Sequence, residues 1–154
     1  MKSLKKLKEA SSKFISSQPL LMLTHVDYLG GYKDIDGKKG GVLRLYSDRI
    51  EYKIIKTVFT ISKEEVKNIA IEGQEQASKR VTATRILAVG VFALLFKKDN
   101  SKKDAFITVE LKDGGEVIFY TSKKSHTDLR KEPKTHKMMS MFNEDGKMKI
   151  KKAD

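Results

Sequence analysis

Apolar and polar residues alternate along several short segments of the chain, with the two-residue period that is typical of β-strands. Turn-forming residues such as glycine, aspartate and serine separate these segments. The pattern predicts strands over residues 20–28, 42–46, 50–55, 57–61, 66–71, 105–111 and 116–121. Asp113 and Gly114 lie between the last two segments, where an Asp-Gly pair strongly favours a hairpin. The chain is therefore expected to be mainly β.

The two ends of the chain have a helical pattern instead. Residues 2–17 place apolar side chains near helical spacing with lysines between them, which predicts a basic amphipathic helix ended by Pro19. A second helix is expected over 134–143, after Pro133, with methionines filling the core. We thus expect a basic helix over 1–18, one domain over 19–143 and a basic flexible tail over 144–154.

The segment from Arg80 to Lys98 is an apolar run between basic ends. Only residues 86–96 are continuously free of charge, whereas a membrane-spanning helix needs about 20 residues. The run is consistent with a helix capped by Thr82 or Thr84 or with a buried strand. We favour a helical turn over 85–89, a break at Gly90 and a strand over 91–96.

The apolar run has two interpretations. It forms part of the core, or it is an interaction face covered by a partner. The candidate residues of such a face are Val91, Phe92, Leu94 and Phe96.

The net charge is +12, and lysines far outnumber arginines. The charge is concentrated at the ends, because residues 1–18 hold five lysines against one glutamate and residues 122–154 hold ten basic against five acidic side chains. Lysine lacks the planar fork that binds phosphates or guanine in a bidentate manner, so non-specific attraction to an anionic surface is favoured. The candidate anion or lipid contacts are Lys5, Lys6, Lys8, the glycine-rich 30–41 loop with Lys33, Lys38 and Lys39, and Arg44.

The residue inventory argues against catalysis. The chain has no cysteine, which excludes disulfides and thiolate metal sites and suits a reducing compartment such as the cytoplasm. Its histidines, His25, His126 and His136, have no metal-binding spacing, and no serine lies in a nucleophile elbow. The glycines of the 30–41 loop lack the spacing and the following helix of a phosphate-binding loop. We expect no enzyme activity, no cofactor and no metal.

The order of these elements and several motifs resemble the bacterial pleckstrin-homology-like (PH-like) domain proteins over about residues 20–142. The motifs are GGVLRLYSDRIEY, then FTISKEEVKNI, and then Arg85, Gly90, Phe92 and Lys97-Lys98 around the apolar run. The resemblance implies a partly open barrel of two nearly orthogonal antiparallel sheets, closed by a C-terminal helix, with loops free to bind.

The sequence departs from the phosphoinositide-binding members among the eukaryotic relatives. Their motif has a basic residue two positions before the arginine that corresponds to Arg44, and VLRLY has none. The closing helix also lacks the tryptophan of the family, whose place would fall to Met139 or Phe142.

Three functions follow as hypotheses. The first is a non-enzymatic interaction module that binds protein partners or its own copies through sheet edges and the apolar run. The second is peripheral attachment to anionic lipids at the inner membrane face, through the lysine-rich ends and the 30–41 loop. The third is non-specific nucleic-acid binding, suggested only by charge.

Overall fold

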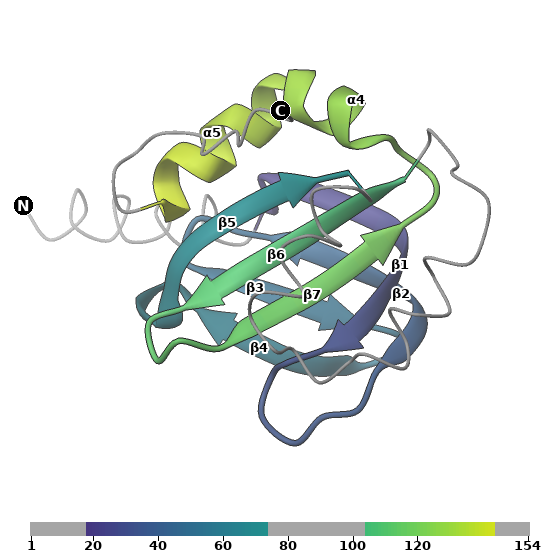
Figure 1. Ribbon diagram of the computed structural model, residues 1–154, viewed down its shortest axis with the longest axis vertical. Helices are drawn as coiled ribbons and strands as arrows, with labels where there is room; N and C mark the ends of the chain where they lie inside the picture. Colours follow the sequence, from purple (N-terminus) through teal and green to yellow (C-terminus); the bar gives the residue numbers. More distant parts are fainter. Residues whose placement is uncertain (1–17, 74–103, 144–154) are drawn as a thin grey trace, which may run out of the picture.

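The computed structural model describes residues 18–73 and 104–143 of the chain (Figure 1). The strands are β1 (Leu21–Gly30), β2 (Lys38–Leu45), β3 (Arg49–Lys53), β4 (Thr57–Ser62), β5 (Val66–Glu72), β6 (Ala105–Leu111) and β7 (Glu116–Thr121). A 3-10 turn, η1 (Lys63–Glu65), precedes β5, and two helices, α4 (His126–Lys131) and α5 (Pro133–Phe142), follow β7. The expected mainly β fold with a C-terminal helix is confirmed.

All seven strands belong to one antiparallel sheet with the order β4-β3-β2-β1-β7-β6-β5. β1 joins the two halves, because it pairs with β2 on one side and with β7 on the other. Figure 1 shows the sheet folded over, so that β5, β6 and β7 lie in front of β1 to β4. The core lies between these two layers.

The strand boundaries follow the sequence closely, with two informative exceptions. β6 and β7 have the predicted bounds, but β2 begins at Lys38 rather than at residue 42. The sequence pattern did not predict this extension because residues 40 and 41 are glycines, which have a low propensity for β-strands. Gly40 has φ +72°, and its N–H donates to the Asp27 carboxylate over 2.9 Å, so the strand continues through an irregular register.

The predicted end of the third strand is wrong. β3 ends at Lys53, and Ile54 and Ile55, which we assigned to the strand, lie in the turn before β4. Consecutive isoleucines are unusual in a turn, where glycine, asparagine and aspartate dominate. This turn is the most exposed apolar feature of the described residues.

Inward-facing side chains of all seven strands form the core, and its centre is aromatic. Tyr28, Tyr52, Phe59 and Phe119 are buried, and their ring centroids lie between 4.8 Å (Tyr28 to Phe59) and 6.1 Å (Phe59 to Phe119) apart. Such offset and tilted ring pairs add stabilisation beyond the area that they bury.

The helices close one end of the core. The Ser125 hydroxyl caps α4 by accepting from the Asp128 N–H, and Pro133 begins α5, where its missing N–H costs nothing. Met138, Met139 and Phe142 of α5 are at most 3 % exposed within the core cluster. The predicted role of these methionines as core residues is confirmed.

Several predictions lie outside the described residues. These are the basic N-terminal helix, the conformation of the apolar run and the C-terminal tail.

The end of α5 is tied to the outermost strand, β5. The Asn143 side-chain oxygen accepts a hydrogen bond of 2.7 Å from the buried N–H of Ile69. β5 is at the edge of the sheet, where a strand's outward N–H groups have no neighbouring strand to bind. Asn143 therefore supplies the acceptor that a further strand would have supplied.

We predict that Asn143→Ala lowers the free energy of unfolding by about 1–3 kcal/mol, because it leaves a buried N–H without its acceptor. Urea unfolding of the two proteins measures the difference. Ser140→Ala on the exposed side of α5 is the control and should be nearly neutral. Equal free energies of unfolding of wild type and Asn143→Ala would show that the hydrogen bond between Asn143 and Ile69 does not contribute to stability.

Candidate functional site

The turn between β3 and β4 exposes two isoleucines between two lysines. Ile55 is 94 % exposed and Ile54 is 45 % exposed, and Lys53 and Lys56 flank them. The Ile54 N–H donates to the Lys56 carbonyl over 3.2 Å, which closes the turn. The turn therefore presents apolar side chains to water in a fixed, compact loop.

The strand register brings two more lysines to the same end of the sheet. Val42 of β2 lies opposite Lys53 of β3, so the start of β2, with the exposed Lys38 and Lys39, runs past the turn. We call Ile54, Ile55 and the four lysines Lys38, Lys39, Lys53 and Lys56 the tip surface.

Tyr52 fixes the strands beneath the tip surface. Its hydroxyl lies 2.8 Å from the Val26 carbonyl and 3.3 Å from the Lys38 carbonyl, and its ring lies where a side chain at Gly41 would be. A Cβ at Gly41 would come within 2.4 Å of this ring, so only glycine allows the close approach. The aromatic core thus positions the backbone that carries Lys38 and Lys39.

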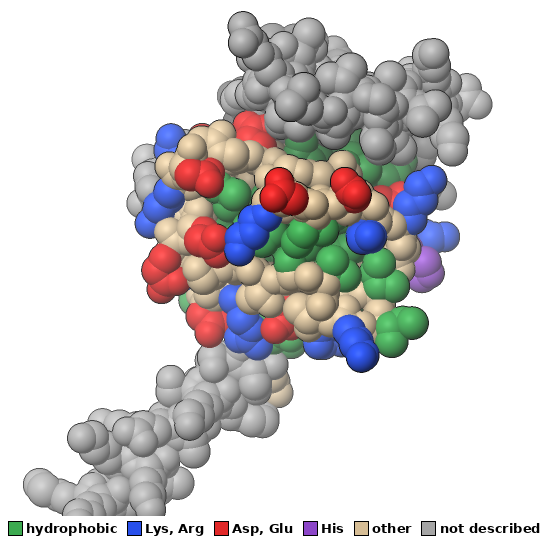
Figure 2. Space-filling view, turned by 90° about the horizontal axis from the view of Figure 1, so that it is seen from below, with side chains coloured by type: hydrophobic (Ala, Val, Ile, Leu, Met, Phe, Trp, Pro, Cys, Tyr) green, Lys and Arg blue, Asp and Glu red, His purple; other side chains and the backbone are tan. Residues whose placement is uncertain are grey.

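Two acidic side chains on the adjoining strands have partners, and one of these partners, Lys53, belongs to the tip surface itself. The Asp27 carboxylate accepts from the Gly40 N–H, and Glu51 pairs with Arg49 at 3.0 Å and with Lys53 at 4.0 Å. Figure 2 views the end of the molecule opposite the helices: acidic side chains lie at its left and in its upper middle, hydrophobic side chains lie in its middle and at its right, and basic side chains lie along its right-hand rim. The positive charge of this end is therefore local rather than uniform.

The β1–β2 loop, residues 31–37, is anchored to the core rather than extended into solvent. The Tyr28 hydroxyl accepts from the Tyr32 N–H at 2.9 Å and lies 3.0 Å from the Ile35 carbonyl oxygen. The Tyr32 hydroxyl lies 3.2 Å from both the Thr60 carbonyl oxygen and a carboxylate oxygen of Glu65. Two tyrosines thus hold the loop across one end of the core.

The structure therefore places the predicted anion contacts in different parts of the molecule. Lys33 lies on the anchored loop, and its Nζ is 5.1 Å from the centre of the Tyr32 ring. The same loop contains the negatively charged Asp34 and Asp36, which reduce its net positive charge. Only Lys38 and Lys39 lie at the tip surface.

Arg44 belongs to the middle of β2 and not to the loop. It lies opposite Met22 of β1 and Glu51 of β3, and its half-buried side chain places Nε out of water with no hydrogen-bond partner among the described residues. The remaining candidates, Lys5, Lys6, Lys8, Val91, Phe92, Leu94 and Phe96, lie outside the described residues.

Sequence reasoning missed Ile54 and Ile55. Continuing the alternation of β3 made Ile54 an inward-facing strand residue, whereas the chain turns one residue earlier. The available signal was the lysine on each side of the pair, since Lys-Ile-Ile-Lys is not a pattern of a half-buried strand.

Other chemistry was also sought in residues 18–73 and 104–143. Within these ranges no three His, Asp or Glu side chains are arranged to hold a metal ion. No helix of the same ranges has the length and apolarity needed to cross a membrane.

A comparison of the chain with models of known protein families finds no match, and a search of curated proteins finds none either.

The anchored loop gives a pH-dependent prediction. Burial, and then the nearby Glu65 carboxylate, raise the pKa of Tyr32 from 10.0 to about 12. A raised pKa in the folded state favours the protonated form, so this stabilisation is complete below pH 10 and is lost as the pH rises toward 12.

We therefore expect Tyr32→Phe to be destabilising below pH 10, with a difference from wild type that shrinks between pH 10 and about 12. Urea unfolding of both proteins across this range measures the difference. A difference that stays constant with pH would contradict the assignment of this titration to Tyr32.

Proposed function

We propose that this chain is a non-enzymatic PH-like module that attaches peripherally to an anionic membrane through the tip surface. The observation that carries the proposal is the pair Ile54 and Ile55, exposed at a turn and flanked by lysines. Apolar side chains enter the acyl boundary of a bilayer, and lysines beside them meet the anionic headgroups.

The expected affinity is modest. Burying an exposed isoleucine is worth roughly 1.5–3 kcal/mol when it is complete, and a lysine near an anionic surface adds about 1 kcal/mol. A few such contacts give reversible binding, which the charge at the chain ends would strengthen. This agrees with the departure of the sequence from the phosphoinositide motif, since no single headgroup needs to be recognised.

The order of elements supports the PH-like assignment. Seven antiparallel strands are followed by helices, in the order that the resemblance implies, although the strands form one continuous folded sheet rather than two separate sheets. The turn that carries the tip surface is not part of the core, so its side chains are free to serve binding.

The described residues give less support to the two other hypotheses, which are partner binding and nucleic-acid binding. Self-association or partner binding through the apolar run concerns residues 91–96, outside the described ranges. Proteins that bind single-stranded nucleic acids use exposed aromatic rings for stacking. In the described part of the chain the exposed large apolar side chains are Met22, Ile54 and Ile55, none of them aromatic.

Co-sedimentation with vesicles of mixed neutral and anionic lipids tests the proposal. We expect binding that is lost in about 0.5 M salt because the charges are then screened. The double substitution Ile54→Gln and Ile55→Gln should weaken binding about tenfold or more, as the loss of about 1.4 kcal/mol or more of apolar insertion implies.

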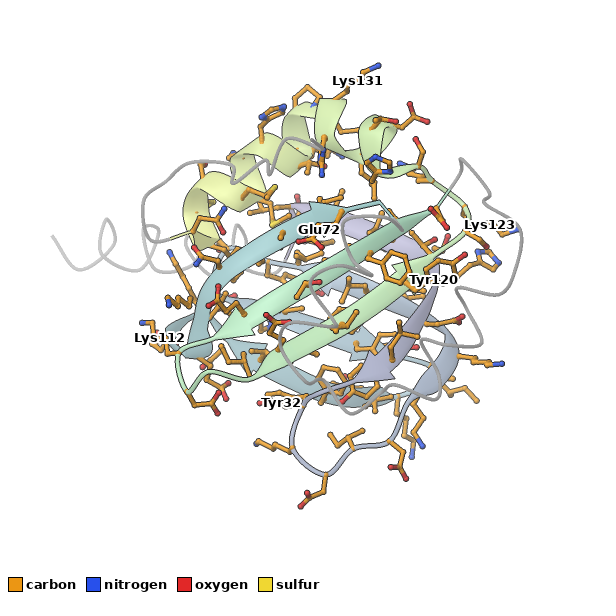
Figure 3. The ribbon with its side chains drawn as sticks, in the orientation of Figure 1. Tyr32, Glu72, Lys112, Tyr120, Lys123 and Lys131 are labelled. Atoms are coloured by element: carbon orange, nitrogen blue, oxygen red, sulfur yellow. The ribbon has the colours of Figure 1, made fainter. Side chains whose placement is uncertain are left out.

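Matched controls separate the tip surface from general charge and hydrophobicity. Met22→Gln removes an exposed apolar side chain elsewhere, and Lys131→Gln removes a lysine from the end that carries the helices (Figure 3). Both should bind vesicles nearly as wild type does, whereas Lys53→Gln with Lys56→Gln should bind less. If the isoleucine double variant binds as wild type, the tip surface is not the membrane contact.

A further inference from the structure

The outward-facing side of β5, β6 and β7 is largely buried, although it does not face the core. The register arranges its residues in rows across the strands: Glu72, Phe106 and Tyr120 form one row, and Ala70, Thr108 and Ile118 form the next. We call these two rows the outer face. Phe106 and Ile118 are each 1 % exposed, and Thr108 is 2 % exposed.

This burial is unusual for an antiparallel sheet, which commonly has one face in water. The opposite layer follows that expectation, since the outward-facing Thr24, Thr60 and Lys53 are exposed or half-buried. The outer face also packs within itself, because the rings of Phe106 and Tyr120 lie 5.0 Å apart. Burial, with the nearby carboxylates of Asp104 and Asp27, raises the pKa of Tyr120.

The described elements do not account for the cover. In Figure 1 the outer face is turned toward the viewer, and none of the described strands or helices lies in front of it. Figure 3 shows Glu72 and Tyr120 on this near side. The buried residues of α4 and α5 belong instead to the core cluster between the layers.

Residues 74–103, which lie outside the described residues, connect two strand ends beside the outer face. β5 is followed by Gly73 and β6 is preceded by Asp104, and Glu72 and Phe106 are paired neighbours, so residues 74–103 leave and return at the same row. Residues 97–103 alone can reach about 23 Å when extended, which is about the length of the seven-residue strand β6. The apolar run 86–96 is therefore within reach of every position on the face.

The apolar run and the outer face have complementary compositions. The run contains eleven residues without charge, between Arg80 and Arg85 on one side and Lys97 and Lys98 on the other. The outer face has Phe106 and Ile118 in its middle, and the carboxylates of Glu72, Asp104, Glu110 and Glu116 lie at its ends, although that of Glu110 also pairs with Lys67 at 3.5 Å. Apolar contact in the centre and opposite charges around it favour this pairing.

We propose that residues 86–96 of the same chain dock on the outer face of β5, β6 and β7. Docking gives this sheet layer a second apolar contact, independent of the core, and makes the apolar run a covering segment rather than a surface for partners. The proposal does not depend on the membrane attachment proposed above, since the tip surface lies on the other layer.

Cross-linking tests the proposal. Because the sequence contains no cysteine, a thiol-specific reagent reacts only with the cysteines that are introduced. Ala70→Cys on the outer face is combined with Ala88→Cys or with Ala93→Cys in the run, and a short thiol-specific cross-linker is added to the full chain. We expect an intramolecular link in most molecules of at least one pair, identified on a denaturing gel and by peptide mass. Thr60→Cys, exposed on the opposite layer, replaces Ala70→Cys in the control and should link in few molecules.

The outcomes discriminate between occupants. A link that appears only as a dimer, and that falls as the protein is diluted, would show that a second copy covers the face and would overturn docking within one chain. Linking no greater than in the Thr60→Cys control would overturn docking altogether. Far-UV circular dichroism and a cooperative thermal transition establish that each double-cysteine protein is folded before it is linked.

Discussion

The contact on which much of this structure depends is the aromatic cluster of Tyr28, Tyr52, Phe59 and Phe119. The four rings come from β1, β3, β4 and β7, so they join the two layers that the folded sheet brings together. Two of them also have hydroxyl groups at the rim of the core. Tyr28 holds the β1–β2 loop and Tyr52 holds the start of β2, so the same cluster that stabilises the fold positions the surface loops.

This coupling explains why the loop and the turn at one end of the molecule differ in character. The β1–β2 loop is glycine-rich, yet the buried tyrosine hydroxyls need partners, and the loop backbone supplies them. The β3–β4 turn makes no such contact, and its isoleucines remain in water. An apolar pair that contributes nothing to the core is costly for solubility, which is why we assign it a binding role.

Sequence patterns predicted most of the described fold and only part of the candidate site. Alternation located all seven strands, because inward-facing side chains such as Ile107, Val109, Val117 and Phe119 recur every second residue. It did not show where β3 ends, since an isoleucine in the phase of Ile50 and Tyr52 looks the same in a strand or in a turn. Nor could it show that Lys38 and Lys39 lie beside Lys53 and Lys56, because this proximity follows from the register between strands.

The outer face marks a further limit of the same reasoning. The outward positions of β6 and β7 are occupied by Phe106 and Ile118, but the sequence alone does not distinguish an apolar side chain that faces solvent from one that is covered. Only the three-dimensional arrangement shows that these side chains lie outside the core cluster and are nevertheless buried. The two surfaces therefore differ in kind: the tip surface is small and exposed and contains lysines, whereas the outer face is wide and largely buried, with carboxylates at its ends. The first suits a transient contact with an anionic surface, and the second suits a permanent contact with an apolar, basic segment such as the one this chain contains.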